Sequence, residues 1–297
     1  MMASFAATAM RCACIDIGSN TTRLLVADVA GDRLEPIVQQ RSFTRLGRAI
    51  AACGTMSGDA IDAVARVVEV QRGVAETAGA TALRVVATAA VRGAANRDDL
   101  VAAVRDRAGL AVEIVDGEEE ARLAFHGATR TLGEALPGAI AVVDVGGLSS
   151  EIAVGTHAGG VTWARSYAVG SGRLAARCAA DPPSPADVAM MRAEAAAAFA
   201  GAIPDADVAI AVGGSAASLP TLVGPVLDDA ARERALATLT AMPAAEVARR
   251  HELAPERTLL MPAGILVLGA AADALRRPLR IARGGLREGV VLELAKT

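Results

Sequence analysis

Two stretches of the chain share one pattern of apolar and polar positions. Residues 15–26 and residues 143–154 each begin with an apolar run, continue through an acid and a turn of glycine and hydroxyl residues, and end in a second apolar run. Without gaps, Asp16 aligns with Asp144, and Gly18 aligns with Gly146. Each stretch predicts a tight β-hairpin. The repetition indicates that the chain contains a diverged duplication.

Strand-like and helix-like patterns alternate along the rest of the chain. Apolar runs predict strands over residues 33–38, 82–87, 112–115, 161–169, 208–212 and 279–281. Helical spacing and start signals predict helices over residues 57–78, 99–108, 116–132, 170–178, 187–199, 229–240, 243–250, 258–275 and 286–294. Residues 41–48, which include three arginines, are expected to form an exposed loop. The alternation predicts an α/β fold.

A stretch rich in glycine and proline, residues 133–138, separates the two halves of the chain. A chain of 297 residues is long enough for two domains that each bury a core. We therefore place an N-terminal domain at residues 11–132 and a C-terminal domain at residues 133–297. Whether the last helix packs back on the first domain is left open. Residues 1–10 lack the basic start of a signal peptide, and we expect a disordered leader there.

Composition and charge exclude several classes of function. The formal net charge is −3, and aromatic residues make up 2% of the chain, so we expect no nucleic-acid partner. Lys296 is the only lysine, which excludes a P-loop, a kinase-type strand lysine and Schiff-base chemistry. The four cysteines lack CxxC spacing, which favours a reducing cytoplasmic location. Residues 258–275 are apolar, but proline and glycine within them favour a buried helix over a membrane span.

The two predicted turns have the chemistry of an anion site. Backbone N–H groups and hydroxyls at such turns can bind phosphate, and the adjacent carboxylates, Asp16 and Asp144, can hold a divalent cation or a water. Gly213, Gly214 and Ser215 follow a predicted strand and precede a helix. That pattern can cradle a phosphate or a nucleoside, and it fits a plain β–α turn equally well.

Two further regions carry candidate charged groups. Arg92 follows a predicted strand end, where α/β sheets usually expose functional side chains. Residues 118–120 are three consecutive glutamates behind Asp116, at the start of a predicted helix. Acids in a first turn suit the helix dipole and need no catalytic purpose. Because successive helical side chains are spaced about 100° apart, at most two of the three glutamates can point into one cleft.

The motifs in this order resemble the exopolyphosphatase and guanosine pentaphosphate phosphohydrolase family, within the actin-like ATPase and sugar-kinase superfamily. The matching pieces are Asp16-x-Gly18-Ser19-Asn20-Thr21, Ala87-Thr88-x-x-x-Arg92 with Asn96, Gly117-Glu-Glu-Glu120-Ala-Arg122, Asp144-x-Gly-Gly147-x-Ser149-x-Glu151, Gly213-Gly-Ser215 and Gly285-Leu-Arg-Glu-Gly289. The resemblance implies two ribonuclease-H-like domains, each a mixed sheet flanked by helices, hinged about a central cleft.

The same resemblance implies roles for these residues. Glu120 would be the general base that deprotonates the attacking water, and Arg92 would neutralise charge. Asp144 and Glu151, together with Asp16, would hold Mg²⁺ or Mn²⁺. The phosphate-binding set would be Gly18, Ser19, Asn20, Thr21, Gly146, Gly147 and Ser149, with Gly213, Gly214 and Ser215.

The implied activity is release of the terminal phosphate from inorganic polyphosphate by metal-assisted attack of water. We expect short chains as substrate, because 297 residues leave no room for large additional helical domains. Hydrolysis of guanosine pentaphosphate is the nearest alternative. A non-catalytic sensor of polyphosphate or of guanosine penta- or tetraphosphate and a phosphotransferase are the others. A homodimer is left open, and no membrane partner is expected.

One position departs from the family pattern. Leu148 stands where the family usually has a third glycine. A positive φ at leucine would cost on the order of 1–2 kcal/mol. On that premise, Leu148→Gly is predicted to tighten phosphate binding or to raise turnover.

Overall fold

The chain folds into two compact units. The computed structural model describes residues 9–296, apart from the side chains of residues 48, 49, 51 and 52. Unit 1 contains the described residues up to Gly133 and those from Gly284 onward, and unit 2 contains Glu134–Arg283. The segment from Gly284 onward groups with unit 1. From the sequence, it was assigned to the second domain, with the packing of its helix on the first domain left open. The leader predicted over residues 1–10 falls mostly outside the described range, and the first strand begins at Met10.

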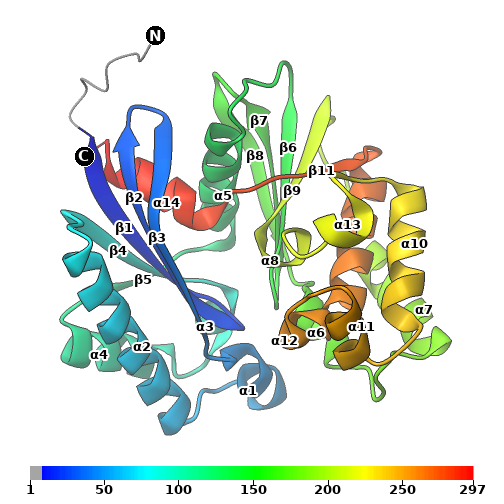
Figure 1. The fold of residues 1–297 in the computed structure, drawn as a ribbon, viewed down its shortest axis with the longest axis horizontal. Helices are drawn as coiled ribbons and strands as arrows, with labels where there is room; N and C mark the ends of the chain where they lie inside the picture. The colour runs from blue at the N-terminus through cyan, green and yellow to red at the C-terminus, as the bar shows by residue number, and fades with distance from the viewer. Residues whose placement is uncertain (1–8, 297) are drawn as a thin grey trace. The chain divides into compact units, whose positions relative to one another are not determined.

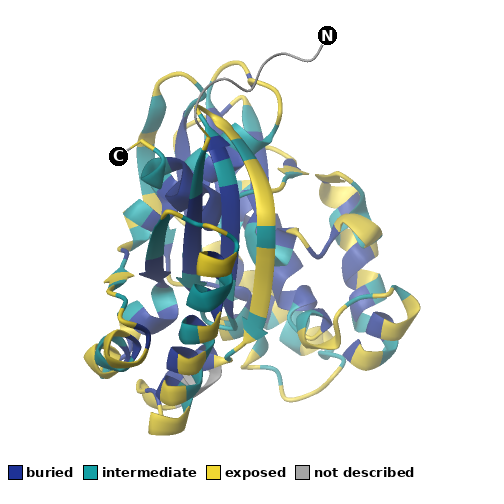
Figure 2. Ribbon diagram, turned by 60° about the vertical axis from the view of Figure 1, so that its left-hand side comes forward, coloured by how far each residue is buried: buried dark blue, intermediate teal, exposed yellow. Residues whose placement is uncertain are grey.

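Unit 1 contains a five-stranded sheet in the order β3-β2-β1-β4-β5 (Figure 1). Its strands are β1 (Met10–Ile17), β2 (Thr21–Ala30), β3 (Arg33–Phe43), β4 (Ala82–Ala87) and β5 (Val112–Ile114). The first three strands are antiparallel, whereas β1, β4 and β5 are parallel. The edge strand β3 is largely exposed, while the central strands are buried (Figure 2). Pro36 lies on this edge strand, the part of a sheet where proline is tolerated.

The helices of unit 1 are α1 (Leu46–Cys53), α2 (Gly58–Thr77), α3 (Ala89–Gly93), α4 (Arg97–Ala108), α5 (Gly117–Thr131) and α14 (Leu286–Leu294). Helix α2 begins as predicted, because the Ser57 hydroxyl accepts a hydrogen bond from the Ala60 N–H at 3.3 Å. Helices α2 and α4 pack against each other, and α5 packs along α14 (Figure 1). Alternate residues of β1, Cys12 and Cys14, share a core with Val290 and Val291 of α14.

Unit 2 repeats this topology. Its six-stranded sheet has the order β10-β11-β9-β6-β7-β8. The strands are β6 (Ile140–Val145), β7 (Ser150–Thr156), β8 (Gly160–Tyr167), β9 (Val208–Val212), β10 (Val226–Leu227) and β11 (Leu279–Ile281). Strands β6, β7 and β8 are antiparallel, and β6, β9 and β11 are parallel, as in unit 1. The structure therefore confirms an α/β fold with two mixed sheets, and β10 is an addition to the shared pattern.

The helices of unit 2 are α6 (Ser171–Ala175), α7 (Pro185–Ala198), α8 (Gly213–Ala216), α9 (Pro220–Val223), α10 (Asp229–Thr240), α11 (Ala244–Arg250), α12 (Pro255–Thr258) and α13 (Met261–Leu275). Helix α13 is buried almost throughout and packs against α6, α7 and α10. None of the helices within residues 9–296 is long and apolar enough to cross a membrane.

Two predicted segments are wrong in detail. Residues 41–48 are not a loop, because β3 continues to Phe43 and α1 begins at Leu46. The helix expected over residues 258–275 is two helices, since α12 ends at Thr258 and α13 starts at Met261. Pro262 explains the second start, because proline has no N–H to donate within a helix and fits its first turn.

Candidate active site

The two hairpin turns have the same backbone geometry. The Gly18 N–H donates to the Thr21 carbonyl at 3.0 Å, and the Gly146 N–H donates to the Ser149 carbonyl at 3.0 Å. A Cβ on Gly18 would lie 3.2 Å from the first carbonyl, and a Cβ on Gly146 would lie 3.1 Å from the second. Both positions therefore favour glycine because the chain folds closely back on itself. The two predicted hairpins are confirmed.

Each turn is held by the segment that follows the third strand of its unit. In unit 1, the Gly47 N–H donates to the Ser19 carbonyl at 2.7 Å. In unit 2, the Arg173 N–H donates to the Gly147 carbonyl at 2.8 Å. Gly170 is required for this approach, since a Cβ there would lie 2.6 Å from the Gly147 carbonyl carbon. The first of these contacts was not expected, because the sequence pattern predicted a loop over residues 41–48.

Not every hydroxyl near the turns is available to a ligand. The Ser150 hydroxyl donates to the Val169 carbonyl at 2.6 Å and is fully buried. Its counterpart in unit 1, the Thr22 hydroxyl, lies 3.2 Å from the Thr44 hydroxyl and is also buried. Both hydroxyls therefore fix the chain after the third strand. The candidate phosphate ligands Ser19, Asn20 and Thr21 lie at or beside the first turn and are half-buried, whereas Ser149 is buried.

The hairpins differ in the residue that faces the aspartate across the strand pair. Asp16 is opposite Arg23, whereas Asp144 is opposite Glu151. Cross-strand neighbours have Cβ atoms about 4.5–5.5 Å apart, so like charges at such a pair repel. Glu151 is 2% exposed and accepts a hydrogen bond from the Ser166 hydroxyl at 2.7 Å. Two carboxylates on one face are a donor set that suits a hard divalent cation.

The residues present fit such a cation only in part. Within the described part of the chain, no group of three or more His, Cys, Asp or Glu side chains could enclose a metal ion. Mg²⁺ commonly takes one or two carboxylates and completes its shell with waters and substrate phosphates. The pair of Asp144 and Glu151 meets that requirement. Asp144 also lies against Gly213, because a Cβ on Gly213 would collide with its Oδ1 atom.

Asp16 has a different environment. Its Oδ1 atom is buried and has no hydrogen-bond partner within the described chain. Burial raises the pKa of Asp16, while the positive charges of Arg23 and Arg287 oppose that rise. Arg287 is itself buried and donates to the Leu24 carbonyl at 3.3 Å. The motif around Arg287 was recognised in the sequence, but the effect of its charge on Asp16 was not.

The structure brings Arg92 and Glu120 together. Arg92 Nη1 donates to Glu120 Oε2 at 3.0 Å and to the Val115 carbonyl at 2.7 Å. Glu120 is 9% exposed. The Asp116 carboxylate caps α5 by accepting from the N–H groups of residues 118 and 119, at 3.0 and 2.9 Å. Of the three consecutive glutamates, therefore, one is buried beside an arginine, and Glu118 faces solvent.

The third glycine-containing segment forms the start of α8. Gly213 has a φ of +79°, which favours glycine, and follows β9 directly. The Gly214 carbonyl accepts from the Arg257 guanidinium and, at 2.9 Å, from the Ser218 hydroxyl. Ser215 lies close to Gly264, where a Cβ would be 3.1 Å from the serine hydroxyl. Arg257 was not anticipated, because its separation in sequence gives no sign of this contact.

Asn96, part of one recognised motif, has a structural role. Its amide oxygen accepts from the Met56 N–H at 2.9 Å, and its amide nitrogen donates to the Met56 carbonyl at 2.9 Å. Both hydrogen-bonding groups of its side chain therefore hold the turn that precedes α2.

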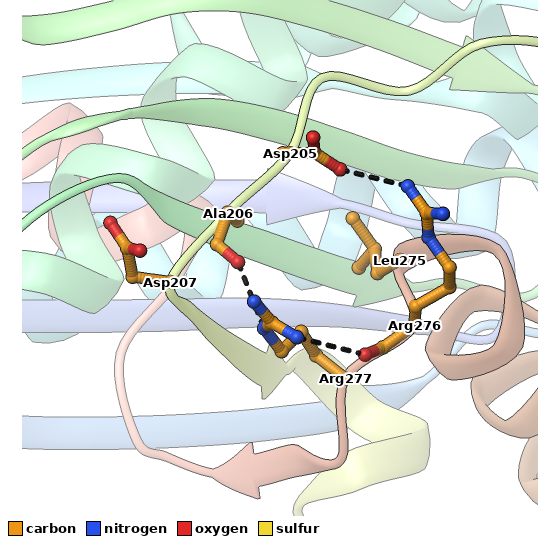
Figure 3. Close-up of a pocket in the computed structure, with 6 residues that line it drawn as sticks. All are labelled: Asp205, Ala206, Asp207, Leu275, Arg276 and Arg277. Carbon is orange, nitrogen blue, oxygen red and sulfur yellow. Dashed lines mark hydrogen bonds and ion pairs between the residues drawn. The ribbon is translucent and has the colours of Figure 1, made fainter.

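A surface pocket of about 520 Å³ lies elsewhere in unit 2 (Figure 3). It is lined by Asp205, Ala206, Asp207, Leu275, Arg276 and Arg277. Arg276 forms an ion pair with Asp205 at 3.0 Å, and Arg277 Nε donates to the Ala206 carbonyl at 3.0 Å (Figure 3). None of the predicted site residues lines this pocket.

Comparison with known proteins relates the site to one family. The profile of the Ppx/GppA phosphatase family matches residues 25–297. Exopolyphosphatase 1 of Mycobacterium bovis is 30% identical over 303 residues, covering 95% of this chain and 88% of that protein. Exopolyphosphatase 2 of Mycobacterium tuberculosis is 37% identical over 193 residues, covering 61% of this chain. The match spans 59% of that relative's own length.

Solved structures agree in fold. The crystal structure of the Aquifex aeolicus Ppx/GppA family member has a TM-score of 0.82 and 25% identity, covering 97% of this chain and 98% of that chain. An exopolyphosphatase from Cytophaga hutchinsonii has a TM-score of 0.85 and 21% identity, with the same coverage of both chains. The expected fold class, two mixed sheets flanked by helices, is therefore confirmed.

Proposed function

Because the chain belongs to the Ppx/GppA phosphatase family, we propose that it hydrolyses inorganic polyphosphate from the chain end, releasing one phosphate per turnover. The observation that carries this proposal is the buried carboxylate of Glu120, held by Arg92 at 3.0 Å. A carboxylate that is fixed and largely shielded from bulk water suits the alignment of one attacking water molecule. The exopolyphosphatase relatives support polyphosphate over guanosine pentaphosphate as the substrate.

In the proposed reaction, Glu120 accepts a proton as the water oxygen attacks the terminal phosphorus atom. The bond from that phosphorus to the bridging oxygen breaks, and the shortened polyphosphate leaves with the bridging oxygen. Arg92 holds the carboxylate of Glu120 in place through its hydrogen bond to Oε2 at 3.0 Å. Phosphoryl transfer needs mainly positioning and charge stabilisation. We assign these tasks to the N–H groups and hydroxyls of the two turns.

We assign the metal to the second hairpin. Asp144 and Glu151 would hold Mg²⁺ or Mn²⁺, which supplies charge neutralisation to the phosphate oxygens when bound. Asp16, the third carboxylate expected to hold the metal, faces Arg23 rather than a carboxylate across its own strand pair. Ser166 keeps Glu151 oriented through its hydroxyl at 2.7 Å. We further propose short polyphosphates as substrates and a cytoplasmic location, which the free cysteines support.

The experiment is an assay of released phosphate with purified protein, Mg²⁺, polyphosphates of defined length and, separately, guanosine pentaphosphate. Glu120→Gln is expected to lower turnover by about 10²–10⁴-fold, because it removes the proton acceptor. Glu118→Gln is the matched control, since this exposed glutamate lies on the same helix turn, and it should retain wild-type turnover.

Absence of phosphate release from every polyphosphate would contradict the proposal. Calorimetric binding of polyphosphate without release would instead support a sensor. Faster release from guanosine pentaphosphate than from any polyphosphate would move the assignment to the alternative substrate.

A further inference from the structure

The two phosphate turns contain no cationic side chain of their own. Neither turn contains a lysine or an arginine among residues 18–21 and 146–149. Arg92 is the cation that the family resemblance supplies, but its charge is compensated by Glu120 at 3.0 Å. With a net charge of −3, the chain must bind a polyanion through local arginines. Two arginines outside the turns have backbones that are hydrogen-bonded to the turns.

Arg45 is fixed to the first turn by its backbone. Its N–H donates to the Asn20 carbonyl at 3.0 Å, and the Thr44 N–H donates to the same oxygen at 3.1 Å. The Arg45 side chain is exposed. Its backbone is left-handed, with a φ of +53°, a conformation that glycine or asparagine adopts at lower cost than arginine. Residues with such strained backbones concentrate at functional sites, so the strain at Arg45 suggests that its side chain has a function.

Arg173 is fixed to the second turn in the same way. Its N–H donates to the Gly147 carbonyl at 2.8 Å, and its side chain is exposed. One guanidinium nitrogen donates to the Ala168 carbonyl at 2.7 Å. Because a guanidinium carries several N–H donors in a fork, this bond leaves others for a ligand. Each unit thus places one exposed arginine directly beside its own turn.

We propose that Arg45 and Arg173 are substrate-binding residues, each of which binds phosphate oxygens of the anion held at the neighbouring turn. A guanidinium fork matches two oxygens of one phosphate, and such charge-assisted pairs are stronger than neutral hydrogen bonds. The inference rests on the proposed function for the class of ligand, a linear polyphosphate. It adds two residues that belong to neither the turns nor the carboxylates.

The test measures binding of inorganic tripolyphosphate by calorimetry, in EDTA so that turnover does not interfere. Arg45→Ala, Arg45→Gly and Arg173→Ala are each expected to raise the Kd about tenfold or more, because each loses a charge-assisted contact. Arg45→Lys should retain part of the affinity. Arg45→Gly should also raise the midpoint of thermal unfolding by about 2 °C, because glycine relieves the left-handed backbone.

Arg33→Ala is the matched control. Arg33 begins β3, whereas Arg45 follows the end of this strand. Arg33 pairs with Ala30 at the far end of β2, whereas Phe43 pairs with Thr21 beside the turn. Ten residues of strand place it about 30 Å away. An unchanged Kd in both Arg45→Gly and Arg45→Ala would overturn the proposal for Arg45, and an unchanged Kd in Arg173→Ala would overturn that for Arg173. An equal loss in Arg33→Ala would show general charge attraction and overturn both.

This binding experiment does not depend on catalysis. Wild-type chain that binds tripolyphosphate through Arg45 and Arg173 but releases no phosphate would support this inference and contradict the proposed hydrolase. Normal phosphate release by the wild-type chain, with an unchanged Kd for tripolyphosphate in the arginine variants, would support the proposed hydrolase. The same result would contradict the proposed roles of Arg45 and Arg173.

Discussion

At the scale of single residues, Asp144 and Glu151 are the pair of side chains that we propose as metal ligands. They are directly opposite across β6 and β7. A metal that binds the folded state stabilises it by about 2.7 kcal/mol at a concentration a hundredfold above its Kd. We therefore expect Mg²⁺ to raise the unfolding midpoint of the wild-type chain relative to EDTA, and Glu151→Gln to lose most of that rise.

Ser166→Ala is the control for this metal experiment. It keeps both carboxylates and removes the hydroxyl that orients Glu151, so it should retain a reduced Mg²⁺ effect. The midpoint of thermal unfolding is measured with and without Mg²⁺ for the wild type, Glu151→Gln and Ser166→Ala. An equal Mg²⁺ response in Glu151→Gln and in wild type would place the cation elsewhere.

The backbone conformation of Leu148 changes the effect that we expect from replacing this residue with glycine. The predicted gain from Leu148→Gly assumed a positive φ at this corner. The non-glycine residues with positive φ in the described chain are Arg45, Glu252 and Arg276, so Leu148 carries no such strain. Glycine would mainly add entropy to the unfolded chain. We now expect Leu148→Gly to lower stability by about 0.5–1 kcal/mol, without faster turnover.

Urea unfolding and the phosphate-release assay measure the two parts of this prediction. A higher turnover in Leu148→Gly, with stability unchanged, would contradict the assignment of an unstrained turn.

At the scale of elements, glycines allow the backbones of α5 and α14 to approach each other closely. A Cβ on Gly289 would collide with the Leu123 carbonyl, and a Cβ on Gly127 would collide with the Gly285 carbonyl. Because α5 also carries Glu120 in its first turn, a shift of this helix moves the proposed base. We expect Gly289→Ala to cost about 1–3 kcal/mol of stability, as overpacking does, and to reduce turnover as well.

Gly73→Ala is the matched control for this helix contact. Gly73 lies within α2, and a Cβ there would meet no atom within 4 Å. Alanine should therefore stabilise the protein by about 0.5–1 kcal/mol through helix propensity. Chemical denaturation compares the two variants. A stable, fully active Gly289→Ala chain would show that α14 can move without disturbing α5.

The elements that the sequence predicted correctly are those whose signals are local. The hairpins follow from the glycine turns between apolar runs, and α2 follows from the Ser57 cap and helical spacing. Helix α1 was missed because its start depends on carbonyls of the distant first turn, which accept from residues 44, 45 and 47. The contact of α14 with α5 could not be predicted from local sequence patterns either, since it joins residues more than a hundred positions apart.

The candidate site was predictable to a similar extent. The family motifs named Arg92 and Glu120, and the structure places them in contact across 28 positions of sequence. The motifs gave no reason for the charge of Arg287 to act on Asp16, or for Arg257 to donate to the Gly214 carbonyl. These arginines are positioned by tertiary packing of helices, which a pattern along the chain does not encode.

At the scale of the whole molecule, unit 1 is built from two separate pieces of the chain. Helix α14 contributes Leu286, Val290, Val291 and Leu292 to a core that also contains residues of β1, β2 and β4. Burial of such side chains contributes about 1.5–3 kcal/mol each. Typical domains are stable by only about 5–15 kcal/mol, so unit 1 should not fold without this helix.

This discontinuity makes a prediction about dissection of the chain. The backbone at Gly284 lies against Gly127 and Thr131 near the end of α5, so a short linker can join residue 133 to residue 284. A chain of residues 9–133 joined to residues 284–297 by a short Gly-Ser linker is expected to be monomeric and to unfold cooperatively. The chain of residues 9–133 alone should aggregate or bind hydrophobic dyes, because the sheet face under α14 is uncovered. Circular dichroism and thermal unfolding compare the two, and an equally cooperative transition in the shorter chain would contradict the assignment of α14 to the core of unit 1.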